Sequence, residues 1–457
     1  YARAFVFVKE SKLVALVVLE CGFISHHLKA ALVDKCKAQI PEMSLKMDNL
    51  LLCAQNTHSA PGGHSHYAFH NISSKGFRPE IFNAYLKACF DALVLAWRDL
   101  SDCTLYLNAD LFAEDNDVAF NRSLDAYNRN PDVPIFDEMQ THLALNRMMK
   151  QIRIGTAQSG NKGLINWFGV QANSVSASNL KVHSDNKGYA AALLENDQST
   201  GFNFVAAFCQ EAAADVSPNY YGKAKWWARG RYEDDFKSAY ANGFLQFEKA
   251  REMVEGEEFQ ISIGEELDSL MWYVDMSNVT CDPDFCQGAE TERTGPPVAG
   301  LAFIEGNSPD VDGTDAFSTG LLRMVINYRE MLYELPLIRP KSERQQLKYL
   351  KQIHQPKTLA IEFAGKKVLG YRRLNKLPLP TVMAEITEEV KRQYEANALN
   401  EHSWSPLILP LQLIRLGDIV VVGFPGDLST TAGSRLRKTI LATLEPIGIL
   451  DVIINTY

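Results

Sequence analysis

Short apolar runs, each followed by a polar loop, alternate along this chain with longer amphipathic segments. Several runs are continuous rather than alternating, which is typical of strands that are buried on both faces. We predict strands at 4–8, 13–19, 50–54, 104–108, 164–170, 204–208, 411–416, 419–424 and 449–454. Apolar residues at helical spacing predict helices over 79–100 and 234–255. Ser429 or Thr430 can cap a further helix, and Gly417-Asp418 predicts a hairpin turn.

Strands that alternate with helices predict an α/β fold in the form of a mixed α+β layered domain. The 457 residues are interpreted as one large domain, 1–457, with a helical, basic excursion around 321–357. The segment 282–316 is rich in Gly, Pro and Asp, and we expect ordered loops there because aromatic residues continue through it. Functional residues of such folds gather on the loops that follow the strands.

The charge balance excludes one class of partner. A net charge of -9 argues against nucleic-acid binding, since a phosphate-binding surface needs a basic excess. No apolar run reaches the roughly 18 residues of a transmembrane helix, so we expect no transmembrane span. The chain begins at Tyr1 rather than Met, and we expect that an N-terminal segment precedes it. The sequence does not distinguish an organellar location, such as the mitochondrion, from a secretory one.

The eight cysteines form no CxxC pair, which gives no support to a zinc ribbon or a thioredoxin-type site. Four of them lie in apolar runs, where cysteine behaves as a small buried hydrophobe, namely Cys21, Cys53, Cys89 and Cys209. Cys281 and Cys286 flank a polar loop. They either pair or remain two free thiols.

Four polar loops could carry chemistry. The first, 55–63, is followed by His64, His66 and His70, and so many histidines indicate either metal binding or a solvated, turn-rich loop. The second is Asn121-Arg122-Ser123. The third starts at Gln171 and leads to 184–189, and the fourth is 215–219. In the fourth loop Ser217 beside Asp215 is either a nucleophile or, as we favour, part of a tight turn before Pro218.

Together these loops resemble the signature segments of the neutral/alkaline ceramidase family. Thr57–Gly63 is similar to THSGPGG, Asn121–Ser123 to NRS, and Ser184–Ala190 to SDNxGYA. Phe204–Asn219 is similar to FVAAF followed by GDVSPN, and Pro425–Gly433 to PGEFTTMAG. The matches keep their order along the chain. The resemblance implies the family's catalytic-type domain and zinc-dependent hydrolysis of ceramide to sphingosine and a fatty acid. It also implies a C-terminal β-sandwich, which we do not expect within these 457 residues.

The residues that correspond to the family's zinc ligands are changed. The resemblance places two ligand histidines at Asn56 and Gln171, a glutamate at Asp427, and a tyrosine at or beyond Tyr457. Neutral amide oxygens are weak zinc donors. The shorter Asp427 side chain would place its carboxylate ~1.5 Å short of the ion. We therefore expect that these degenerate positions hold no metal and that the protein has no cofactor.

Other family positions are retained. By the resemblance, His58 is a histidine that assists catalysis and Arg122 an arginine that shapes the substrate pocket; we interpret both as vestigial. Ser123, Asp215 and Ser217 are expected to be pocket or turn residues. A rearranged site that combines His58, His64 and His66 with Asp427 would require His64 and His66 to turn inward, and we do not favour it.

The leading hypothesis is a ceramidase-like protein without hydrolase activity. It would serve a structural or interaction role, with other protein subunits as partners in a larger assembly. One alternative is an active N-acylsphingosine amidohydrolase with a remodelled zinc site. Another is a protein that binds ceramide or another acyl lipid without catalysis.

Overall fold

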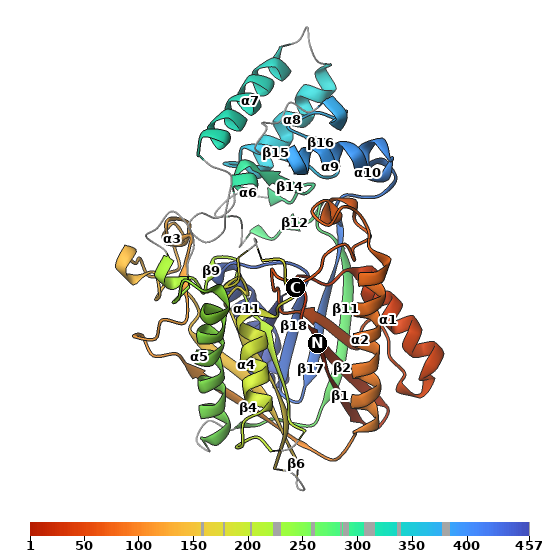
Figure 1. Ribbon diagram of the computed structural model, residues 1–457, viewed down its shortest axis with the longest axis vertical. Helices are drawn as coiled ribbons and strands as arrows, with labels where there is room; N and C mark the ends of the chain where they lie inside the picture. Colours follow the sequence, from red (N-terminus) through yellow and green to blue (C-terminus); the bar gives the residue numbers. More distant parts are fainter. Residues whose placement is uncertain are drawn as a thin grey trace. The chain divides into compact units, whose positions relative to one another are not determined.

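The chain divides into two compact units in the computed structural model (Figure 1). The first unit comprises 1–61, 80–272 and 411–457, and the second comprises 62–79 and 273–410. The structure describes residues 1–156, 160–176, 179–201, 203–222, 230–256, 261–283, 286, 292–305, 316–335, 340–376 and 384–456.

Three sheets carry the first unit. In one, β1 (Ala2–Lys9) pairs antiparallel with β2 (Lys12–Leu19), which runs parallel to β3 (Leu50–Ala54). The second has the order β10 (Ile261–Ser262), β4 (Thr104–Leu111), β6 (Met148–Thr156), β7 (Gly160–Phe168), β8 (Val205–Gln210). The third has the order β11 (Leu267–Asp275), β17 (Ile408–Leu416), β18 (Ile419–Phe424), β19 (Asp451–Thr456).

Helices cover the outer faces of these sheets. The helices α1 (His26–Gln39) and α2 (Pro79–Arg98) share a buried cluster with β2 and β3. The second sheet carries α4 (Asp185–Glu195) and α5 (Asp235–Glu255), which lie side by side (Figure 1). The third sheet carries α11 (Thr430–Leu444). A small ladder, β5 (Phe120–Asn121) with β9 (Val216–Ser217), precedes the short helix α3 (Leu124–Asn128).

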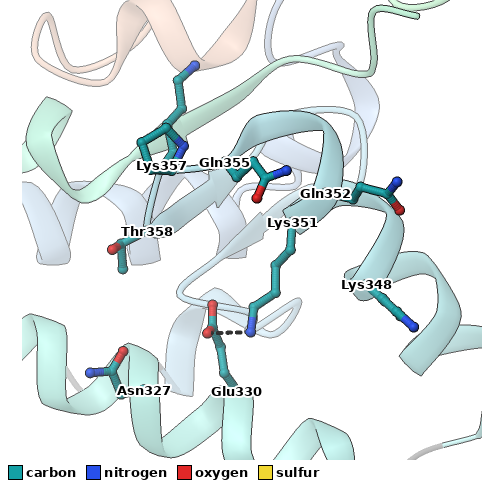
Figure 2. Close-up of a pocket in the computed structure, with 9 residues that line it drawn as sticks. Asn327, Glu330, Lys348, Lys351, Gln352, Gln355, Lys357 and Thr358 are labelled. Atoms are coloured by element: carbon teal, nitrogen blue, oxygen red, sulfur yellow. Dashed lines mark ion pairs between the residues drawn. The ribbon is translucent and has the colours of Figure 1, made fainter. Parts of the chain in front are cut away.

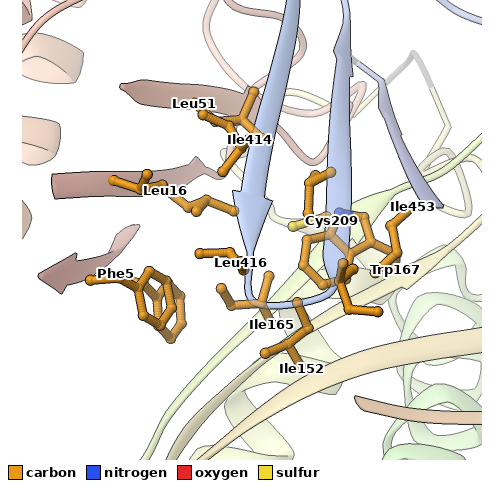
Figure 3. Close-up of a cluster of buried hydrophobic side chains, with 14 of the residues drawn as sticks. Phe5, Leu16, Leu51, Ile152, Ile165, Trp167, Cys209, Ile414, Leu416 and Ile453 are labelled. Carbon is orange, nitrogen blue, oxygen red and sulfur yellow. The ribbon is translucent and has the colours of Figure 1, made fainter. Parts of the chain in front are cut away.

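The central strands are apolar on both faces because each face has its own core. On β2, Leu16 joins a central cluster between the sheets, whereas its neighbour Val17 joins the cluster under α1 and α2. On β7, Trp167 points into the central cluster (Figure 3). Its neighbour Phe168 belongs to the cluster under α4 and α5. Each such side chain contributes roughly 1.5–3 kcal/mol of burial free energy. The continuous apolar runs thus reflect burial between helices and a second sheet.

The predicted α/β layered fold is confirmed. Most predicted strands are present with ends shifted by a few residues, and the Gly417 turn joins β17 to β18 with φ +61°. Ser429 caps α11 by accepting from Ala432 N, and Asp234 caps α5. Of the longer strands, β6 and β11 were not predicted. In β6, Lys150, Gln151 and Arg153 are buried polar residues that hide the strand pattern.

The second unit mixes short strands with helices. Its strands are β12 (Thr280–Cys281), β13 (Glu292–Arg293), β14 (Val298–Gly300), β15 (Leu359–Glu362) and β16 (Lys367–Val368). Its helices are α6 (Leu301–Glu305), α7 (Ala316–Glu334), α8 (Lys341–His354), α9 (Ala384–Glu395) and α10 (Ala398–Glu401). The helices α7 and α8 overlap the range 321–357, in which we predict a helical, basic excursion. The expected ordered loops of 282–316 fall partly outside the described residues, and β13, β14 and α6 lie within that range.

Two further expectations concern the cysteines and a transmembrane helix. All eight cysteines are free thiols, so Cys281 and Cys286 do not pair, and Cys286 Sγ donates instead to Asp282 O at 3.2 Å. The four cysteines expected to be buried are buried. Within the described ranges, no helix has both the length and the apolarity to cross a bilayer.

Candidate functional site

Three loops of the first unit meet where β3, β7 and β18 end. They bring Asn56, Gln171 and Asp427 together as a hydrogen-bonded chain. Asn56 Nδ2 donates to Gln171 Oε1 at 2.7 Å, and Gln171 Nε2 donates to Asp427 Oδ2 at 3.0 Å. Asn56 and Gln171 are buried, whereas Asp427 is exposed. Residues that are 115 and 256 positions apart in sequence therefore form one contiguous polar cluster.

The backbone holds Asn56 and Gln171 in fixed positions. Asn56 adopts φ +63°, a left-handed conformation that asparagine tolerates better than most residues. Gln171 N donates to Val216 O, Gln171 O accepts from Asn186 Nδ2, and Gln171 Nε2 also donates to Ala213 O at 3.0 Å. The side-chain amide of Gln171 therefore uses both of its hydrogens and its oxygen within the protein.

The segment 184–190 serves as the support for the Gln171 loop. The Asp185 carboxylate is fully buried and accepts from the backbone N–H groups of Ser174 and Val175. Burial raises the pKa of Asp185, although these N–H bonds act in the opposite direction. The neighbouring Asn186 bridges Gln171 O and Ser174 Oγ. This segment thus shapes the loop on which the second position of the cluster stands.

The residues of this cluster do not fit a zinc ion. Zinc sites in proteins use imidazole, thiolate or carboxylate donors, and here Asp427 supplies the one such group among the three. The amide oxygen of Gln171 already accepts a hydrogen bond from Asn56, so a metal would have to compete with that donor for the oxygen. Across the described residues, no group of three or more His, Cys, Asp or Glu side chains is arranged to hold a metal.

The retained family positions Arg122 and His58 lie in the same unit. Arg122 Nε and Nη2 both donate to Ala214 O, at 3.1 and 2.5 Å, and Arg122 N donates to Asp215 O. His58 is exposed, and its backbone N donates to Ala172 O at 3.2 Å. Arg122 therefore fixes the fourth loop, while His58 stands at the surface beside the third.

Asp215 joins three segments. Its buried carboxylate accepts from Thr430 N at 2.7 Å and Thr430 Oγ1 at 2.9 Å, at the start of α11. The other oxygen accepts from Asn121 Nδ2 at 2.9 Å, and Asn121 Oδ1 accepts from Ser123 N. A carboxylate at a helix N-terminus is favoured by the helix dipole and by the first-turn N–H groups. Asp215 thus acts as a structural clamp.

Ser217 has the geometry of a turn residue. It lies on β9 and is fully buried, and its Oγ accepts from Asn219 N at 3.0 Å. A serine nucleophile requires a base within hydrogen-bond reach and an approach for the substrate. The histidines His64, His66 and His70 belong to the second unit, where the His66 and Tyr67 rings lie tilted by 40° with centroids 4.0 Å apart.

The sequence reading missed two buried ionisable residues near the cluster. Lys187 on α4 is fully buried; its Nζ donates to Phe168 O at 2.8 Å, and burial lowers its pKa to about 7. Burial raises the pKa of Glu211 to about 7, although Lys150 and Asn146 act against that shift. Lys187 lies in the predicted loop 184–189, but no local pattern marks it or Glu211 as a buried ionisable group, because the burial of both depends on distant elements.

Comparison with known proteins places these observations in a family. The family model for the N-terminal part of neutral/alkaline non-lysosomal ceramidases matches residues 1–372. Neutral ceramidase of Pseudomonas aeruginosa is 28% identical over 474 residues, which cover 100% of this chain and 60% of that protein. Neutral ceramidase of Drosophila melanogaster is 26% identical and is covered to 62%.

Two solved structures of ceramidases are similar in fold to this chain. The crystal structure of neutral ceramidase from Pseudomonas aeruginosa superposes with a TM-score of 0.75 at 26% identity, covering 100% of this chain and 61% of that one. A ceramidase complexed with C2 gives a TM-score of 0.74 at 26% identity. The chain spans about 60% of the length of the relatives that it matches. The chain belongs to the neutral/alkaline non-lysosomal ceramidase family.

Proposed function

We propose that this chain is a ceramidase-family protein that does not hydrolyse ceramide with zinc and that serves a structural or interaction role. The observation that carries the proposal is the chain Asn56–Gln171–Asp427. Two amides and one carboxylate satisfy one another there by hydrogen bonds of 2.7 and 3.0 Å.

Zinc binding at this cluster depends on the donor atoms of the side chains and on the hydrogen bonds that already occupy them. An amide oxygen carries no charge and is a hard, weak donor for zinc, so replacing two imidazoles removes most of the binding free energy. Without a bound metal, no water is acidified towards a pKa of ~7 and no carbonyl is polarised. The hydrogen bonds within the cluster add to the cost of binding, because a metal would have to displace them.

The test is a reversion. The full chain and the triple variant Asn56→His, Gln171→His, Asp427→Glu are incubated with zinc, desalted and analysed for metal, and both are assayed with ceramide. We expect no stoichiometric zinc and no turnover for the natural chain, and a gain of zinc for the variant. A matched control places the same residue types at exposed positions, Asn196→His, Gln140→His and Asp99→Glu, and should gain no zinc.

Two results separate the alternatives. Stoichiometric zinc together with ceramide turnover in the natural chain would refute the proposal and establish a remodelled active site. Sphingolipid that co-purifies with the natural chain, without turnover, would support lipid binding in place of the structural role.

A further inference from the structure

Helix α7 of the second unit carries an apolar stripe that faces solvent. Its members are spaced four, three and four residues apart, which places them on one face of a helix, and they are Met324, Tyr328, Met331 and Leu335, the residue directly after the helix. Their exposed fractions are 63%, 61%, 53% and 44%. The stripe runs for roughly 16 Å along the helix axis at 1.5 Å per residue.

The core contacts of α7 lie on the opposite face. Leu322 and Ile326 are fully buried and Arg329 is 8% exposed. At 100° per residue these three positions fall opposite the stripe, so the helix already has its packing face. The exposed stripe is therefore a second apolar face of α7, and its members lie outside the buried cluster that the described residues of the unit form.

A basic pocket flanks this stripe between α7 and α8. The pocket has a volume of about 440 Å³, and its lining includes Asn327 and Glu330 from α7 with Lys348, Lys351 and Lys357 (Figure 2). At 100° per residue, Asn327 lies about 70° and Glu330 about 130° around the helix from the centre of the stripe. Lys351 pairs with Glu330 at 2.6 Å. Within the described ranges, no ion pair involves Lys348 or Lys357, and both are exposed.

The charge of this segment is opposite to that of the whole chain. Residues 321–357 contain eight Lys and Arg against three Glu, a net charge of +5, whereas the chain carries -9. Figure 2 shows that the ammonium groups of Lys348 and Lys357 point in different directions rather than towards one point. Such a spread suits an extended anionic surface better than a single small anion.

We propose that this face of α7 and α8 binds the surface of a membrane that contains anionic phospholipids. Met, Tyr and Leu side chains enter the boundary between headgroups and acyl chains, where tyrosine is favoured. The lysines of the flanking pocket, Lys348 and Lys357, meet lipid phosphates. An exposed apolar stripe next to a cationic patch is the pattern that interfacial helices use. This inference does not depend on whether the chain hydrolyses ceramide.

Vesicle flotation of the full chain tests the proposal. We expect binding to vesicles of phosphatidylcholine with phosphatidylserine, little binding to phosphatidylcholine alone, and release at about 1 M salt, where the Debye length is about 3 Å. The stripe variant Tyr328→Ser with Met331→Ser should bind about tenfold or more weakly. The charge variant Lys348→Gln with Lys357→Gln should do the same, at ~1 kcal/mol for each lysine.

Matched controls use exposed residues of the first unit. Leu95→Ser with Ile447→Ser removes comparable exposed apolar surface, and Lys237→Gln with Lys438→Gln removes two exposed charges. Both controls should bind like the natural chain, and all variants should keep its denaturation midpoint. Failure of the natural chain to bind anionic vesicles would overturn the proposal and leave the face to a protein partner. Equal binding by the natural chain, the stripe variant and the charge variant would overturn it as well. Neither result bears on zinc binding or ceramide turnover.

Discussion

Replacing Lys187 with methionine tests the buried polar layer behind the site. The lysine is fully buried, its Nζ donates to Phe168 O at 2.8 Å, and Gln246 Oε1 lies 3.5 Å away. Burial lowers its pKa from 10.5 to about 7, although Cys209 and Glu211 act in the opposite direction. Methionine has a similar length and adapts to irregular space, so the substitution removes the charge with little change in volume.

The pKa difference fixes the sign of the pH dependence. Between about pH 7 and pH 10.5 the unfolded chain holds this proton and the native protein does not, so native stability rises with pH in that window. At ~1.4 kcal/mol per pKa unit, the burial costs roughly 5 kcal/mol at pH 7. The substitution also removes the hydrogen bonds from Lys187 to Phe168 O and Gln246 Oε1, and this loss lowers the free energy of unfolding by about 1–3 kcal/mol. Lys187→Met should therefore raise the free energy of unfolding by roughly 2–4 kcal/mol at pH 7, and the gain should vanish or reverse near pH 10.

Urea unfolding at pH 7 and pH 10 measures this difference, with the fluorescence of buried tryptophans such as Trp167 as the signal. Lys237→Met, at an exposed position, is the control and should change little at either pH. If the change in unfolding free energy were the same at both values of pH, Lys187 would not titrate as its burial requires, and the reasoning would be wrong.

Three further substitutions address other parts of the site and fold. Glu211→Gln should stabilise the protein by about 3 kcal/mol above pH 7 and have little effect near pH 4. Burial raises the pKa of the Glu211 carboxyl from 4.5 to about 7, so the stability of the natural protein falls as the pH rises between these two values. Denaturant unfolding at pH 4 and above pH 7 measures the difference. Asp215→Ala should cost about 3 kcal/mol in denaturant unfolding, since it leaves buried donors of the α11 start without their acceptor, and a loss under ~1 kcal/mol would contradict the clamp. Gly417→Ala should lower the thermal midpoint far more than Gly201→Ala: both have positive φ, but a Cβ at 417 would lie 2.1 Å from Gly264 O, whereas one at 201 meets nothing within 4 Å.

The sequence predicted the strands of the first unit well, for a local reason. Runs such as 13–19 and 50–54 are apolar at every position, and strands buried between a helix layer and a second sheet require that composition. A capping residue also acts locally, so Ser429 marked the start of α11 correctly. By contrast, β6 carries Lys150 and Arg153 as buried residues, and only partners brought from other elements make their burial tolerable.

What the sequence alone determined is the family and the changed chemistry at three positions, because motif order and side-chain type are written in the chain itself. What only the tertiary structure decided is where those side chains point. Asn56, Gln171 and Asp427 come from loops after three strands of three different sheets, and their mutual hydrogen bonds exist because the folded chain closes those loops on one another. Likewise, the Asp215 carboxylate accepts from Thr430 N and Oγ1 because the fold places the start of α11 against it. Distances between residues far apart in sequence depend on packing, which no local pattern encodes.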